Sequence, residues 1–142
     1  MTLLLPPELP ALDQLASAVE EFAERHNLAA ADAMRLNLVL DELFTNAVDY
    51  GRQPPGSHIA ITLSRGAGQT LVVMEDKGIA FDPLDIPPPD LEAALEDRPI
   101  GGLGLHFLMT FMTDLAYRHA GGKNRLSFRQ IDTTPPLATE TD

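Results

Sequence analysis

The chain has no cysteine among its 142 residues. It can therefore form no disulfide and no thiolate metal site, and it has no cysteine nucleophile; this is compatible with a reducing compartment, and we expect a cytoplasmic location. It also lacks any uninterrupted apolar span of membrane length. Its first residues, MTLLLPPELP, have no basic region and too short an apolar run for a signal peptide. We expect a soluble protein with no membrane partner.

Basic residues are scarce. Ten Lys and Arg stand against 21 Asp and Glu, which gives a formal net charge of −11. Such a surface repels phosphate backbones, so we expect no nucleic-acid partner and favour a basic protein partner. The apolar fraction of 44% is enough for a folded core. The length predicts a single domain, residues 1–131, followed by a polar, proline-containing tail, residues 132–142.

Residue spacing predicts an α+β fold. Apolar residues recur at helical intervals over Pro10–His26, stopped by Asn27, and over Asp32–Tyr50, with Asp32 as N-cap and Gly51 as a left-handed terminator. A third helix is expected at HFLMTFMTDL, after a glycine run. Strand-like patterns flanked by turn residues occur at 3–5, 59–64, 70–76, 115–119 and 125–130.

The order of these elements predicts a two-layer α/β sandwich, with helices on one face of a mixed, mostly antiparallel sheet. Residues 77–100 differ from the rest because they contain many prolines and acids and few large apolar side chains. This composition indicates a long functional loop.

An acid and an amide interrupt the apolar pattern of the second predicted helix. At about 100° per residue, Leu36, Leu40 and Leu43 share the stripe that should face the sheet. Glu42 and Asn46 lie on one flank of that stripe, one turn apart, so both side chains reach the same spot. A carboxylate beside an amide oxygen suits a hard divalent cation and a polarised hydroxyl. The alternative interpretation is a solvated helix edge.

Two further motifs are weak signals when taken alone. In MEDKGIAFDP, Asp76 ends an apolar strand and Gly78 follows it, so the acid could accept from an exocyclic amine while the glycine admits a flat ring. Ordinary strand-end turns use the same residues. In IGGLGLHFL, glycines open a helix and leave N–H groups for a phosphate, but the P-loop and dinucleotide-binding spacings are absent.

Together and in this order, the three motifs E-L-x-x-N-A, D-x-G-x-x-F-D-P and G-G-L-G-L resemble the nucleotide-binding boxes of the GHKL (Bergerat) ATP-binding superfamily. The short chain and the final D-x-x-Y…G-G-x-N-x-L pattern are most similar to bacterial anti-sigma factor serine/threonine kinases of the RsbW type. The resemblance covers the chain from Leu12 to Arg129. Its final pattern consists of Asp114, Tyr117, Gly121, Gly122, Asn124 and Leu126.

The resemblance implies that ATP and Mg²⁺ are bound. Glu42 would be the general base, Asn46 the metal ligand, and Asp76 the partner of the adenine amino group, with a lid over about 78–101. Lys77 and Arg98 remain open candidates for contacting the triphosphate, because the cationic positions of some relatives are not matched here. The remaining nucleotide-binding residues would be Gly78, Phe81, Gly101, Gly102, Leu103, Gly104 and Leu105.

The same resemblance implies a kinase that phosphorylates a STAS-type anti-sigma factor antagonist and sequesters a sigma factor or similar target. It also implies a homodimer. An alternative is a nucleotide-gated binding module that sequesters partners without significant turnover. The presence of Glu42 favours the kinase, because binding alone requires no base. A sensor histidine kinase fragment is disfavoured, because too few residues precede the first helix to hold a dimerisation element.

Overall fold

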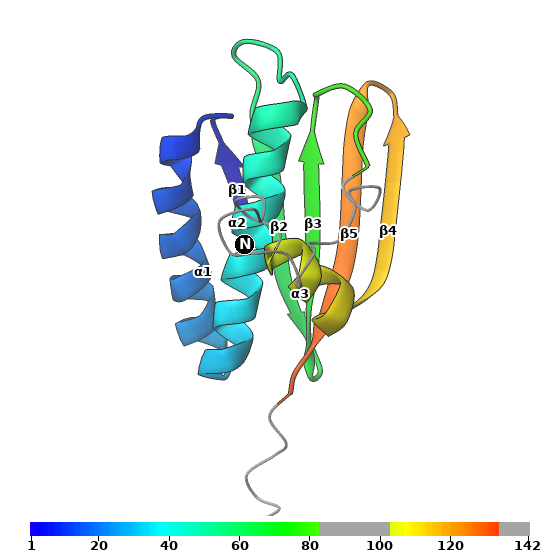
Figure 1. Cartoon of the computed structure of the whole chain (residues 1–142). Coiled ribbons are helices and arrows are strands. Elements are labelled where there is room, and N and C mark those ends of the chain that lie inside the picture. Colours follow the sequence, from blue (N-terminus) through cyan, green and yellow to red (C-terminus); the bar gives the residue numbers. More distant parts are fainter. Residues whose placement is uncertain (83–102, 134–142) are drawn as a thin grey trace, which may run out of the picture.

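The computed structural model describes residues 1–82 and 103–133 (Figure 1). Within these residues five strands and three α-helices follow one another, with a short 3-10 turn before the first helix. Their order and bounds are β1 (Thr2–Leu5), α1 (Leu12–His26), α2 (Ala30–Tyr50), β2 (Ile59–Gly66), β3 (Gln69–Asp76), α3 (Leu103–Phe111), β4 (Met112–Ala120) and β5 (Lys123–Ile131).

The strands form one sheet in the order β1-β2-β3-β5-β4, and each pair of neighbours is antiparallel. The three helices lie on one face of this sheet, with α1 and α2 side by side and the shorter α3 beyond α2 (Figure 1). The predicted two-layer α+β sandwich is therefore confirmed.

The core lies between the helices and the sheet, and the apolar stripe of α2 faces it as predicted. Leu36, Leu40 and Leu43 are all buried. They meet residues of α1 and of the sheet, where Phe22 and Phe128 are fully buried. Burying one such side chain contributes about 1.5–3 kcal/mol, so this stripe fixes the rotation of α2 about its axis.

Helix α2 ends at Tyr50 as predicted, but its start and the conformation of Gly51 were predicted wrongly. The helix begins at Ala30, and Asp32 lies inside its first turn, where the buried carboxylate accepts hydrogen bonds from Thr133 N (3.1 Å) and Oγ1 (2.7 Å). Gly51 has φ −83°, so it is not left-handed. A side chain there would collide with Ala47 O at 2.5 Å, and close packing explains this glycine.

The third predicted helix continued too far. Helix α3 ends at Phe111, and the chain enters β4 at once, pairing Met112 with Gln130 of β5. A short apolar run such as FLMTFM does not distinguish helix from strand, and pairing with β5 decides it. A bulge between Thr113 and Ala116 then shifts the register of β4.

Several predicted features lie outside the described residues. These are most of the expected lid, the tail from residue 134, and Arg98, Gly101 and Gly102. Among the helices that are described, none has the length and apolar character needed to span a membrane.

Candidate functional site

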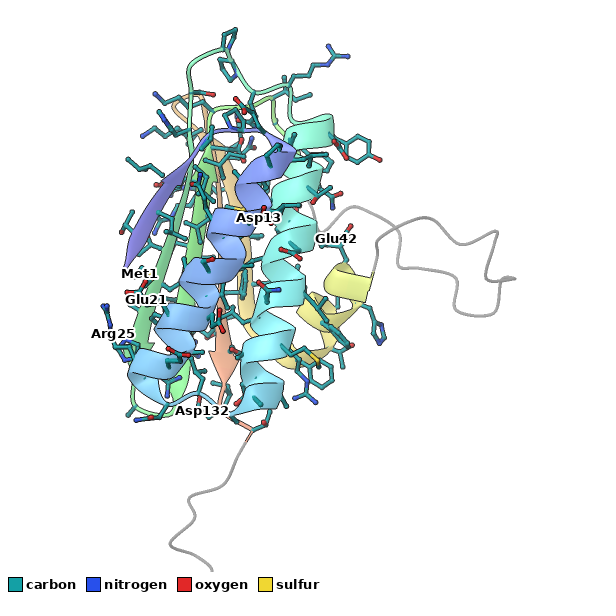
Figure 2. The ribbon with its side chains drawn as sticks, turned by 90° about the vertical axis from the view of Figure 1, so that its left-hand side faces the viewer. Met1, Asp13, Glu21, Arg25, Glu42 and Asp132 are labelled. Atoms are coloured by element: carbon teal, nitrogen blue, oxygen red, sulfur yellow. The ribbon has the colours of Figure 1, made fainter. Side chains whose placement is uncertain are left out.

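Helix α2 carries the first two candidate residues on one flank. Figure 2 shows Glu42 on the side of α2 that faces α3. Asn46, one turn further along, is only 6% exposed. Its Nδ2 atom is buried and has no hydrogen-bond partner among the described residues. Because a buried N–H donor without an acceptor is destabilising, this nitrogen is suited to an acceptor atom on a ligand.

Gly104, in the first turn of α3, brings the third motif against the first. A Cβ atom at this position would lie 2.4 Å from Glu42 Cβ and 2.5 Å from Leu38 O. Neither distance is possible for a real side chain, so only glycine allows α3 to start this close to α2. The first turn of α3, where the N–H groups of a helix have no acceptor within the helix, is thereby fixed beside Glu42.

Asp76, at the end of β3, is buried and held through one oxygen. Its Oδ1 atom accepts hydrogen bonds from Gly78 N (2.8 Å), Asn124 Nδ2 (3.0 Å) and Gln53 Nε2 (3.2 Å). The other oxygen, Oδ2, takes part in none of the hydrogen bonds found in the described segments. The carboxylate therefore keeps one oxygen for an external donor.

The turn after β3 packs directly on the C-terminal end of α2. A Cβ atom on Gly78 would lie 2.3 Å from Gly51 O, and that same carbonyl accepts from Ile79 N at 2.8 Å. Gln53 adds a second link, because its Nε2 atom donates to Ala47 O (3.0 Å) as well as to Asp76. The second motif is thus joined to α2 within one turn of Asn46.

The β4–β5 hairpin completes this arrangement from the other side. Asn124 Nδ2 donates to Ile79 O at 2.7 Å and to Gly78 O at 3.3 Å. Asn124 Oδ1 accepts from Phe81 N (3.3 Å) and from the Tyr117 hydroxyl, which also accepts from Phe81 N at 3.0 Å. The main chain of the segment after β3 is therefore held by hydrogen bonds to the side chains of Asn124 and Tyr117.

A small, mostly apolar pocket lies where these elements meet. Asp76 contributes the one carboxylate of its lining, beside the polar groups of Tyr117 and Asn124, and a flat ring could contact its apolar walls. Its lining residues are Leu43, Ala47, Met74, Asp76, Phe81, Tyr117, Asn124 and Leu126. The ring of Phe81 also lies 6.0 Å from that of Tyr50, which is 59% exposed at the end of α2.

The described members of the three motifs are therefore gathered along the second half of α2. Lys77 is an exception, since it is exposed and lines a second hollow, with His58 and Lys123, to which Asp76 also contributes. Leu105 is buried in the core, so only its backbone could meet a ligand.

Gln53 is a site residue that sequence analysis missed. It stands in a turn, RQPPG, whose sequence indicates nothing about a contact with Asp76. Tyr117 and Asn124 were noted only as part of the family-like pattern, without a role. Their spacing in a tight hairpin was the available signal, since residues on paired strands near a turn lie together.

Next to Glu42, burial raises the pKa of Asp41 above its ordinary value of 3.8. Within the described segments, no group of three His, Asp or Glu residues could bind a metal by itself. Mg²⁺, however, commonly uses one or two protein ligands and completes its shell with water and phosphate oxygens. The side-chain oxygen of Asn46 is a ligand of the kind that Mg²⁺ accepts, and this residue is buried on the same flank of α2 as Glu42.

Fold and site together define a GHKL-type ATP-binding domain. A family model, the histidine kinase-like ATPase domain, matches residues 5–130, and the chain belongs to this family. Serine-protein kinases RsbW from Bacillus thuringiensis and Bacillus anthracis are each 26% identical over 113 residues, covering 77% of this chain and 71% of theirs. The resemblance found in the sequence is confirmed.

Solved structures agree on the fold. The RsbU and RsbW domains of Rv1364c from Mycobacterium tuberculosis superpose with a TM-score of 0.69 at 14% identity; the match covers 95% of this chain and spans about a third (33%) of that one. The histidine kinase domain of the Erythrobacter litoralis EL346 blue-light activated kinase gives a TM-score of 0.51 at 17% identity, covering 88% of this chain and 61% of that one.

Proposed function

We propose that this domain is an ATP- and Mg²⁺-dependent protein serine/threonine kinase. The observation that carries the proposal is the convergence of three separated motifs on one flank of α2. Gly104 abuts Glu42, while Asp76 is tied through Gln53 to Ala47, the neighbour of Asn46. A single extended ligand with an amine at one end and phosphates at the other would reach all of them.

In this proposal Asp76 accepts a hydrogen bond from the adenine amino group, and the start of α3 directs N–H groups at the phosphates. Asn46 would hold Mg²⁺, whose charge would offset that of the triphosphate. Glu42 orients the serine or threonine hydroxyl and takes its proton. The hydroxyl oxygen bonds to the γ-phosphorus as the bond to the bridging oxygen breaks, and ADP leaves.

For partners, we propose a STAS-type anti-sigma factor antagonist as substrate and a sigma factor or similar regulator as the sequestered target. The support is the name and 26% identity of the RsbW relatives. Phosphorylation of the antagonist would release it and free the domain for its target, because one surface binds different partners in different states. The proposed homodimer is tested by sedimentation, in which a monomer at micromolar concentration contradicts it.

Transfer of label from γ-labelled ATP to a candidate antagonist tests the kinase. We expect wild type to transfer label and Glu42→Gln to lose at least about 100-fold in rate, the range of general base catalysis. The matched control is Asp49→Asn, which removes an exposed carboxylate from the same helix and should leave the rate unchanged.

The alternative, a nucleotide-gated binding module, predicts a different pattern in the same experiment. No label would be transferred by wild type, while ATP would still alter the amount of antagonist or target retained. A wild-type protein that transfers label at the same rate as Glu42→Gln would contradict the role given to that carboxylate.

A further inference from the structure

We infer that Asn124 and Tyr117 are positioning residues that give the nucleotide site its selectivity for a 6-amino purine. This inference rests on the proposed ATP site and assigns a role to two residues outside its three motifs. Neither residue is placed in contact with the phosphates. They act through Asp76, whose carboxylate they orient.

The first observation is that the two oxygens of Asp76 are not equivalent. Three donors from three different segments converge on Oδ1: the Gly78 amide, the Gln53 side chain and the Asn124 side chain. No described donor reaches Oδ2. A carboxylate held in this way cannot exchange its oxygens by rotating, because rotation would break three hydrogen bonds at once.

The second observation is that the orientation of the Asn124 amide is fully determined. Its nitrogen faces three oxygens, those of Asp76, Gly78 and Ile79, and its oxygen faces the Phe81 amide and the Tyr117 hydroxyl. Turning the amide over would place its oxygen against three acceptors. Because the side chain is only 5% exposed, water cannot relieve such a mismatch.

Tyr117 holds Asn124 in this orientation. Its hydroxyl donates to Asn124 Oδ1 and accepts from Phe81 N at 3.0 Å. The residues therefore form a chain, from Tyr117 on β4 to Asn124 on β5 and then to Asp76 on β3. Three adjacent strands, in the order β3-β5-β4, contribute one member each.

The chemical consequence concerns the atom at position 6 of a purine. The fixed carboxylate offers Oδ2 as an acceptor, which matches the N–H of a 6-amino group. A 6-oxo group would bring a second acceptor against it and leave both unpaired, which is unfavourable in a buried site. A purine with no substituent at position 6 would lose the hydrogen bond to Asp76, but it would not be repelled by the carboxylate.

The test compares two nucleotides on the intact chain. Dissociation constants are measured by calorimetry for ATP and for purine riboside triphosphate, which lacks only the 6-amino group. A hydrogen bond to a charged group predicts that wild type prefers ATP by about 10- to 100-fold. We expect Asn124→Ala to reduce this preference to a few-fold, and Tyr117→Phe to reduce it by a smaller factor.

The matched control is Ser127→Ala, a truncation on the same strand at a position that pairs with Val73, away from Asp76. It should leave the preference for ATP unchanged. A purely structural role for Asn124 would weaken both nucleotides equally and preserve the ratio, and that result overturns the inference. Should Asn124→Ala fail to fold, the ratio in Tyr117→Phe decides on the same criterion.

Different results would contradict the proposed ATP site and the proposed roles of Asn124 and Tyr117. Wild type that binds neither nucleotide contradicts the ATP site itself and the inference with it. Wild type that prefers ATP, together with variants that keep the full preference, contradicts only the roles of Asn124 and Tyr117.

Discussion

The position of α3 against α2 depends on the absence of a side chain at Gly104. Alanine is ordinarily favoured over glycine inside a helix by about 1 kcal/mol. Here a Cβ atom would overlap Glu42 Cβ and Leu38 O, both on α2. We expect Gly104→Ala to push α3 away from α2, to lower the free energy of unfolding by about 1–3 kcal/mol and to weaken ATP binding.

Urea unfolding and nucleotide titration measure both effects. Thr110→Ala serves as the control, because Thr110 is exposed on the same helix and its replacement by a better helix former should be neutral or slightly stabilising. A Gly104→Ala variant that is more stable than wild type and binds ATP normally would show that α3 does not rest on Glu42.

At the scale of single residues, prediction from sequence succeeded where the residues are close in the chain. Glu42 and Asn46 share a helix flank because helical geometry is regular, and their placement followed from spacing alone. Gln53 could not be found in this way, since its contact with Asp76 crosses 23 positions. Asn124 and Asp76 are 48 positions apart and meet only because β5 pairs with β3.

At the scale of elements, the residue after β5 is joined to strand β2 by an ion pair. Asp132 forms a bidentate pair with Arg65 of β2, at 2.8 and 2.9 Å, and both side chains are less than a third exposed. The hydrogen bond from Arg65 lowers the pKa of Asp132 below its ordinary value of 3.8. The pair is stronger than a fully exposed one because it is bidentate and partly shielded from water.

This pair predicts a pH-dependent difference in stability. Because the folded-state pKa of Asp132 is depressed, its contribution is present above pH 3.8 and is lost as the pH falls through the lower folded-state value. Asp132→Asn should therefore reduce the free energy of unfolding by about 1 kcal/mol near neutral pH. The difference from wild type should disappear in strong acid.

Chemical denaturation of both proteins across this pH range checks the prediction. Glu21→Gln is the control, since the ion pair between Glu21 and Arg25 is about 60% exposed on both sides and should contribute little. A difference between wild type and Asp132→Asn that persists unchanged below the pKa of the carboxyl would show that charge pairing with Arg65 is not its source.

Most elements were predictable because their apolar periodicity agrees with their final environment. Helix α2 and strands β2 and β3 have clear patterns, and each lies within two residues of its predicted bounds. The junction of α3 and β4 did not, because its short apolar run, FLMTFM, is compatible with both helical and strand spacing. There the partner strand β5 decides the conformation, and no local signal reports a partner that comes later in the chain.

For the whole molecule, sheet order explains how distant motifs meet. The C-terminal ends of α2 and β3 lie at the same end of the molecule, and β5 lies between β3 and β4 (Figure 1). The strand-end acid therefore has α2 on one side and the β4–β5 hairpin on the other. The order of the motifs in the sequence indicated the family. The distances between the motifs in space could be obtained only from the folded structure.

The central claim is that these motifs form one Mg·ATP site, and amide chemical shifts recorded during a titration with Mg·ATP test it most directly. We predict that amides of α2 around Glu42 and Asn46, of residues 76–81 and of the start of α3 shift together along one binding curve. The claim would be contradicted if these segments followed different curves, or if the shifts clustered instead in the groove between α1 and α2 that Val19, Ala23 and Met34 line.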